Sequence, residues 1–105
     1  MTLEIRYANK KLERACTDFT EMRKKYSADV AKKLRLRLNE LRAATSFQDL
    51  PKMLGRWEQL SADRSGTWSA RLTKNWRIIV KDISNTSSEN STSEIALVIE
   101  IVDYH

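Results

Sequence analysis

The side chains best suited to chemistry lie at the end of the sequence, where Asp103, Tyr104 and His105 follow a run of apolar residues. Residues 94–102 are apolar at nearly every position, which is typical of a central strand covered on both faces. Such a strand brings an acid, a phenol and an imidazole to one edge of a sheet. The unperturbed pKa of histidine is about 6.5, and a carboxylate beside the ring can fix its tautomer. These three side chains are therefore suited to proton transfer.

Arg71 is the other candidate for chemistry. We expect it on a strand adjacent to the apolar one, facing away from the core, where its planar guanidinium can hold a phosphate. Together, Arg71 and the C-terminal residues are suited to cleaving RNA without a metal ion. The alternative is that they are only a solvated strand end and a surface arginine.

The composition limits the function classes. The 105 residues include 19 Lys and Arg against 14 Asp and Glu, a net charge of +5 that suits nucleic acid, although acidic protein surfaces fit too. A single Cys and a single His are too few for an internal disulfide or a zinc site, so we expect no metal and no cofactor. The length predicts a single domain over residues 1–105. With no signal-peptide pattern and no long apolar run, we expect a cytoplasmic protein with no membrane partner.

The first half of the sequence predicts a strand followed by two helices. Period-two alternation indicates the strand over residues 2–7. An apolar stripe that includes Cys16 indicates one helix over residues 9–26, and Ser27 can cap a second helix over 28–44. Leu36 lies off the second stripe and can cover another neighbour. The outer faces of this hairpin are expected to carry Lys10, Lys11, Arg14, Lys24, Lys25, Lys32, Lys33, Arg35, Arg37 and Arg42.

The second half predicts β structure. A short capped helical turn over residues 46–50 is stopped by Pro51, and a strand follows over 57–60. Two further strands form a hairpin around a three-residue loop, because that register places Trp68, Ala70 and Leu72 on one face with Trp76, Ile78 and Val80. Asn75 then takes the left-handed position of the loop. Residues 84–93 contain no apolar side chain and are expected to form a mobile loop.

These elements predict an α+β fold. A five-stranded, mainly antiparallel sheet carries the two-helix hairpin on one face, and its other face is expected to be open to RNA and to a protein partner.

The motifs of the second half resemble a known family. The run LSADRSGTWSARLTKNWRI at residues 60–78 and EIVDYH at 100–105 are similar to the HigB toxins of the RelE-like superfamily. The resemblance implies a ribosome-dependent endoribonuclease that cuts mRNA in the aminoacyl site. It also implies a HigA-like helix-turn-helix antitoxin as partner, with the ribosome, its RNA and mRNA as the other partners.

The resemblance also assigns residues. It places the catalytic arginine at Arg71 and the other catalytic residues at Asp103, Tyr104 and His105. Many relatives carry His at the position of Glu58 and some carry Lys at that of Ser65, so any contribution of those side chains is altered here. The expected RNA-binding residues are Arg64, Lys74, Arg77, Lys24, Lys25, Lys32 and Lys33.

Two other functions fit the sequence. A basic RNA-binding module without catalysis fits the charge and the aromatic residues of the sheet. A protein-interaction domain that docks a partner on Leu36 and the helix surface fits as well, and it predicts no growth arrest when the chain is expressed alone.

Overall fold

The computed structural model describes residues 3–59, 66–83 and 95–103. In chain order it contains the strand β1 (Glu4–Tyr7), the helices α1 (Lys10–Thr17), α2 (Phe19–Lys25) and α3 (Ala28–Ala43), and the 3₁₀ helix η1 (Phe47–Lys52). The strands β2 (Glu58–Gln59), β3 (Thr67–Arg71), β4 (Trp76–Asp82) and β5 (Ile95–Asp103) follow. The α+β class is therefore confirmed.

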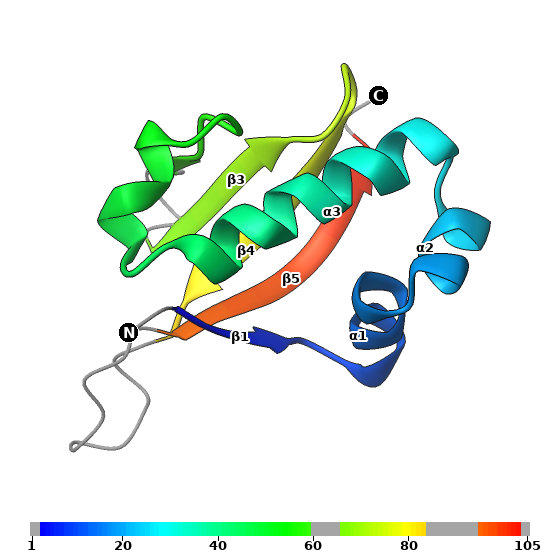
Figure 1. Cartoon of the computed structure of the whole chain (residues 1–105). Helices are drawn as coiled ribbons and strands as arrows, with labels where there is room; N and C mark the ends of the chain where they lie inside the picture. The colour runs from blue at the N-terminus through cyan, green and yellow to red at the C-terminus, as the bar shows by residue number, and fades with distance from the viewer. Residues whose placement is uncertain (1–2, 60–65, 84–94, 104–105) are drawn as a thin grey trace.

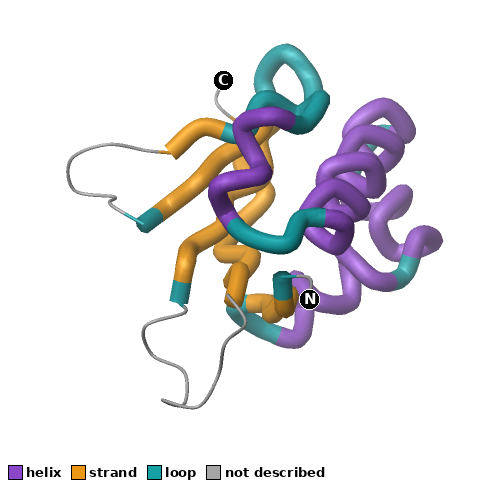
Figure 2. The backbone as a smooth tube through the Cα atoms, turned by 60° about the vertical axis from the view of Figure 1, so that its left-hand side comes forward, coloured by secondary structure: helices purple, strands orange, loops and turns teal. Residues whose placement is uncertain are grey.

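The five strands form one sheet in the order β1-β5-β4-β3-β2. Only the β1–β5 pair is parallel, and the other three pairs are antiparallel. The helix α3 crosses one face of this sheet diagonally, and α1 and α2 lie beside it (Figure 1). In the turned view the strands and the helices form two layers (Figure 2). The core lies between these layers.

The predicted hairpin register is confirmed. Trp68 pairs with Val80 and Ala70 with Ile78, so the apolar side chains of both strands face the helices. The Leu72 N–H donates to the Trp76 carbonyl at 2.9 Å and closes the loop. The expected left-handed Asn75 is wrong, because among the described non-glycine residues only Arg56 has a positive φ, of 48°.

The predicted first helix is two helices. The chain breaks at Asp18, whose carboxylate accepts hydrogen bonds from the N–H groups of Thr20 (3.0 Å) and Glu21 (3.4 Å) and so begins α2. The apolar spacing continues across this break, which is why periodicity alone missed it. The next cap was predicted correctly, because the Ser27 Oγ accepts from the Val30 N–H at 3.3 Å and begins α3.

The segment after α3 differs from the prediction in two ways. Pro51 lies inside η1 rather than ending it, because the turn is closed by the Met53 N–H donating to the Leu50 carbonyl at 3.0 Å. Ser46 makes no capping bond with its side chain. The Asp49 carboxylate instead accepts from the N–H and the hydroxyl of Thr45, and these bonds lower the Asp49 pKa.

The far face of the sheet is open only in part. Arg71 and Lys81 are exposed on this face, which was expected to be open, but Ser69 and Ile79 on the same face are buried. Cys16 is a core thiol, 4% exposed, as its stripe predicted. Burial raises its pKa to about 11. Leu36 is exposed, as predicted. The loop predicted over residues 84–93 lies outside the described residues.

Candidate functional site

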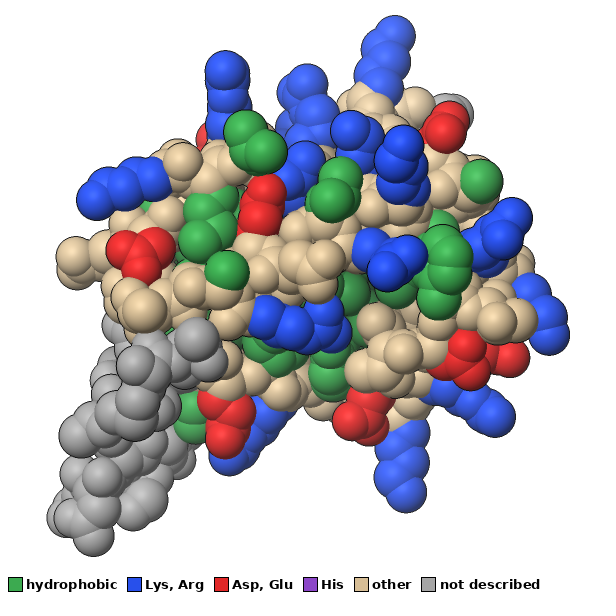
Figure 3. Space-filling model, in the orientation of Figure 1, with side chains coloured by type: hydrophobic (Ala, Val, Ile, Leu, Met, Phe, Trp, Pro, Cys, Tyr) green, Lys and Arg blue, Asp and Glu red, His purple; other side chains and the backbone are tan. Residues whose placement is uncertain are grey.

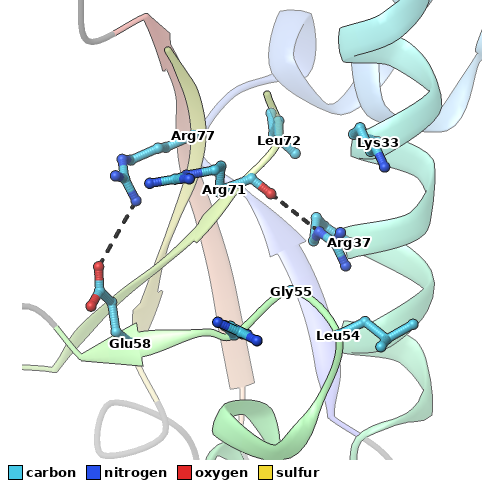
Figure 4. Close-up of a pocket in the computed structure, with 9 residues that line it drawn as sticks. Lys33, Arg37, Leu54, Gly55, Glu58, Arg71, Leu72 and Arg77 are labelled. Carbon is cyan, nitrogen blue, oxygen red and sulfur yellow. Dashed lines mark hydrogen bonds and ion pairs between the residues drawn. The ribbon is translucent and has the colours of Figure 1, made fainter. Parts of the chain in front are cut away.

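A basic hollow of about 400 Å³ opens between α3, the segment after η1, and the end of the β3–β4 hairpin. Five cationic side chains and one carboxylate line it, and the close-up shows that they come from separate segments (Figure 4). The lining residues are Lys33, Arg37, Leu54, Gly55, Arg56, Glu58, Arg71, Leu72 and Arg77. We call this hollow the basic pocket.

The register of the sheet sets two arginines of the basic pocket side by side. Arg71 lies directly opposite Arg77 in the β3–β4 ladder, so both side chains leave the same face of the sheet (Figure 4). Glu58 pairs with Ser69 on β3 and so shares this face, and its carboxylate lies 3.9 Å from the Arg77 Nη1. Like charges directly opposite each other destabilise a sheet. A bound anion between the two arginines would offset that cost.

A buried ion pair on α3 forms the wall behind these arginines. The Arg37 side chain is 11% exposed and that of Glu40 15%, and the two are paired through Arg37 Nη1 and Glu40 Oε2. The Arg37 Nε donates to the Arg71 carbonyl oxygen at 3.2 Å, which ties α3 to the end of β3. The prediction that Arg37 lies on the outer face is therefore wrong. It occupies the buried stripe of α3 with Leu34 and Leu38, where its Nε and Nη1 groups contact Arg71 and Glu40.

The Glu40 carboxylate also holds the segment after η1. It accepts a hydrogen bond from the Gly55 N–H, 3.2 Å from both of its oxygens, and another from the Trp57 Nε1–H at 2.9 Å. Glycine is required at 55 by this approach, because a Cβ there would lie 2.6 Å from Glu40 Oε1 and 2.7 Å from Arg37 Cδ. The segment that carries Arg56 is thus fixed on both sides.

The structure brings some of the predicted residues together and separates others. Arg71, Arg77 and Lys33 share the basic pocket, although they come from three different elements. The remaining predicted lysines are exposed elsewhere, on α2, on α3 and in the β3–β4 loop. They are Lys24, Lys25, Lys32 and Lys74. Lys and Arg side chains stand out widely over the face that carries α3 (Figure 3).

Of the C-terminal residues that were predicted to act with Arg71, only Asp103 lies among the described residues. Contrary to expectation, β3 is not adjacent to β5, because β4 lies between them. Two strand spacings put the two backbones about 10 Å apart. Asp103 pairs with Trp76, whereas Val102 pairs with Arg77, so Asp103 leaves the face opposite to that of Arg71. Tyr104, His105 and Arg64 lie outside the described residues.

Three charged residues of the basic pocket were not predicted as site residues from the sequence. Arg37 had a usable signal, because a charged residue at a buried helical position needs a specific partner. Glu58 was noted only because many relatives carry His at its position. Arg56 had no signal, because nothing in its sequence neighbourhood reveals its positive φ.

The described residues show neither a group of three Asp, Glu, His or Cys side chains placed to hold a metal ion nor a helix with the length and apolar character to cross a membrane.

The fold and the basic pocket define a small α+β protein with a cationic hollow suited to an anionic ligand. The sequence matches one family model over residues 5–95, that of the RelE-like toxin of type II toxin-antitoxin system HigB. The chain belongs to this family of RelE-like toxins. No similar sequence was found among curated proteins.

Solved structures share the fold. The YoeB/ParE toxin from Agrobacterium tumefaciens is 19% identical, with a TM-score of 0.60 over 98% of this chain and 100% of the other. The YoeB-YefM complex from Staphylococcus aureus contains a chain that is 16% identical, with a TM-score of 0.57 over 100% of this chain and 99% of the other. The YoeB dimer from Staphylococcus aureus contains a chain that is 18% identical, with a TM-score of 0.55 over 100% of this chain and 99% of the other.

Proposed function

We propose that the protein is a ribosome-dependent endoribonuclease that cuts mRNA and thereby inhibits translation. The observation that carries this proposal is the basic pocket, where the exposed Arg71 faces the half-buried Arg77 at the end of the hairpin. Membership of the RelE-like toxins supports it. A helix-turn-helix antitoxin of the HigA type is the proposed neutralising partner.

The proposed reaction needs no metal ion. The ribose 2′-oxygen attacks the adjacent phosphorus, the bond from phosphorus to the 5′-oxygen breaks, and a 2′,3′-cyclic phosphate remains. Arg71 stabilises the extra negative charge of the transition state, and Arg77 holds a phosphate oxygen. One group must take the proton of the 2′-hydroxyl and another must give a proton to the leaving 5′-oxygen.

The proton-transfer groups are proposed from two places in the chain. His105 and Asp103 are the candidates from the sequence, and Tyr104 is proposed to orient or stack on the nucleotide. Glu58 is a further candidate to accept the proton, because its carboxylate lines the basic pocket beside Arg77. Lys24, Lys25 and Lys32, together with Lys33, Lys74 and Arg64, are proposed to contact RNA outside the reacting phosphate.

The experiment is cleavage of mRNA on programmed ribosomes by purified protein, with the ribosome's own magnesium kept in place. We expect cuts in the aminoacyl site with cyclic phosphate ends. Arg71→Ala should lower the cleavage rate by about 100- to 1000-fold, the usual effect of losing one preorganised donor, while ribosome binding persists. The matched control is Lys81→Ala, which removes an exposed cation of the same sheet outside the basic pocket.

Two results would contradict the proposal. Products that end in a 3′-hydroxyl would exclude attack by the 2′-oxygen. Ribosome binding by the wild type without any cleavage would identify a basic RNA-binding module instead, and Arg71→Ala would then have no cleavage to remove.

A further inference from the structure

The backbone of the segment after η1 is strained at one residue. Arg56 has a φ of 48°, in the left-handed region that non-glycine residues seldom adopt. A non-glycine side chain is strained in this conformation, and a glycine would avoid the strain. Strain of this kind persists only where the surroundings enforce it, and it gathers at functional sites.

The surroundings that enforce this conformation are on both sides of Arg56. The Gly55 N–H and the Trp57 Nε1–H both donate to the Glu40 carboxylate, at 3.2 Å and 2.9 Å. Trp57 is 1% exposed and fully packed in the core, whereas Arg56 itself is exposed. The chain thus fixes the two neighbours tightly and leaves the arginine side chain on the wall of the basic pocket.

Within the described part of the chain, the Arg56 guanidinium makes no hydrogen bond or ion pair. It nevertheless lines a hollow that already holds the cations of Lys33, Arg71 and Arg77 against a single carboxylate. Adding another cation to such a hollow is unfavourable without a counter-charge. The segment at Gly55 faces the end of β3 across the hollow (Figure 4). A phosphate chain in the hollow would therefore meet guanidinium groups on two sides.

We propose that Arg56 is a further phosphate-binding residue of the basic pocket, and that Glu40 is the positioning residue that holds it there. This inference rests on the proposed function, in which RNA is the ligand. Arg56 binds a phosphate next to the one held by Arg71, and Glu40 acts through the backbone of residues 55–57. Arg37 neutralises Glu40 and does not itself contact RNA.

The first test is Arg56→Gly. Glycine accepts a φ of 48° without strain, so this variant removes the guanidinium while the melting temperature stays equal or rises. The matched control is Lys52→Ala, which removes one exposed cation four residues earlier and outside the basic pocket. The Kd for a labelled single-stranded RNA is measured over a range of salt concentrations.

We expect Arg56→Gly to raise the Kd at least fivefold above that of Lys52→Ala. The slope of log K against log salt should fall by about 0.7, the value for one lost phosphate contact to a single strand. Equal Kd values for Arg56→Gly and Lys52→Ala would overturn the assignment of Arg56.

The second test concerns Glu40 and uses Trp57→Phe, which removes one donor to its carboxylate together with part of a buried ring. If Glu40 acts through Arg56, Trp57→Phe weakens RNA binding in the wild type and has no further effect in Arg56→Gly. If Trp57→Phe weakens RNA binding equally in the wild type and in Arg56→Gly, the positioning role is overturned. Glu40 would then contribute only to the stability of the fold.

A polyphosphate titration separates this inference from the proposed function. If the wild type neither binds nor cuts RNA, the proposed function fails. Weaker polyphosphate binding by Arg56→Gly than by Lys52→Ala would then still support Arg56 as an anion-binding residue. Equal polyphosphate binding by the two variants would overturn the inference as well.

Discussion

Glu40 is the single side chain whose loss should damage the fold around the basic pocket most. Its carboxylate accepts from three donors, which belong to Arg37, Gly55 and Trp57. We expect Glu40→Leu to keep the helix propensity of α3, because Leu and Glu are both good helix formers. Any change in stability then reports the lost carboxylate rather than a weakened helix.

The expected loss in free energy of unfolding follows from the groups that Glu40→Leu leaves without a partner. Removing one partner of a buried ion pair costs about 3–5 kcal/mol, because Arg37 stays charged and buried. The Gly55 and Trp57 donors add about 1–3 kcal/mol each if nothing replaces their acceptor. These terms are not additive, since the segment can shift towards water. We expect a total loss of about 4–6 kcal/mol against a typical domain stability of roughly 5–15 kcal/mol.

The double variant Arg37→Leu/Glu40→Leu separates the terms. It removes the unpaired charge but leaves the Gly55 and Trp57 donors without their acceptor, so it should regain about 2–3 kcal/mol over Glu40→Leu. Urea unfolding followed by circular dichroism at 25 °C gives the free energies. A loss below about 1 kcal/mol for Glu40→Leu, or a double variant no more stable than the single one, would refute the reasoning.

Three further results are expected. Replacing four exposed lysines of α2 and α3 by glutamine should weaken ribosome binding and flatten its salt dependence without unfolding the protein, and an unchanged salt slope would assign them to solvation. These lysines are Lys24, Lys25, Lys32 and Lys33. Deleting residues 103–105 should abolish growth arrest at a small cost in free energy of unfolding, measured by circular dichroism; growth arrest by the folded truncated chain would exclude these residues from catalysis. Burial raises the Cys16 pKa from 9.0 to about 11, so the thiol of the unfolded chain loses its proton at a lower pH than that of the folded protein. The free energy of unfolding should therefore fall as pH rises from about 9 to 11, and it should fall less steeply in Cys16→Ala. An identical pH dependence of the two proteins would contradict the raised pKa of Cys16.

The local pattern of the sequence predicted the hairpin well. Alternation fixed the β3–β4 register, because a shift of one residue would have turned Trp68, Ala70 and Leu72 towards solvent. The cap at Ser27 was equally readable from residue type and position. The break at Asp18 was not, because the apolar stripe continues in phase through α1 and α2, and only the carboxylate contacts reveal it.

The basic pocket was predictable only in part. Arg71, Arg77 and Lys33 were named from the sequence, but their meeting with Arg56 depends on contacts between segments far apart in the chain. The link from Arg37 to the Arg71 carbonyl spans 34 residues, and that from Glu40 to Trp57 spans 17. One sequence without such contacts cannot show that a buried ion pair on a helix shapes a hollow beside a sheet.

The position of β5 has a consequence for how the molecule is made. This strand follows the other four in the sequence, yet it lies between β1 and β4 and pairs with both. During synthesis β1 therefore has no strand to pair with while the helices and the hairpin are made. The complete sheet can form only after β5 has been synthesised. A chain interrupted before β5 would expose two unpaired strand edges, which favour aggregation. Interrupted synthesis should therefore yield an insoluble chain rather than a weakened toxin.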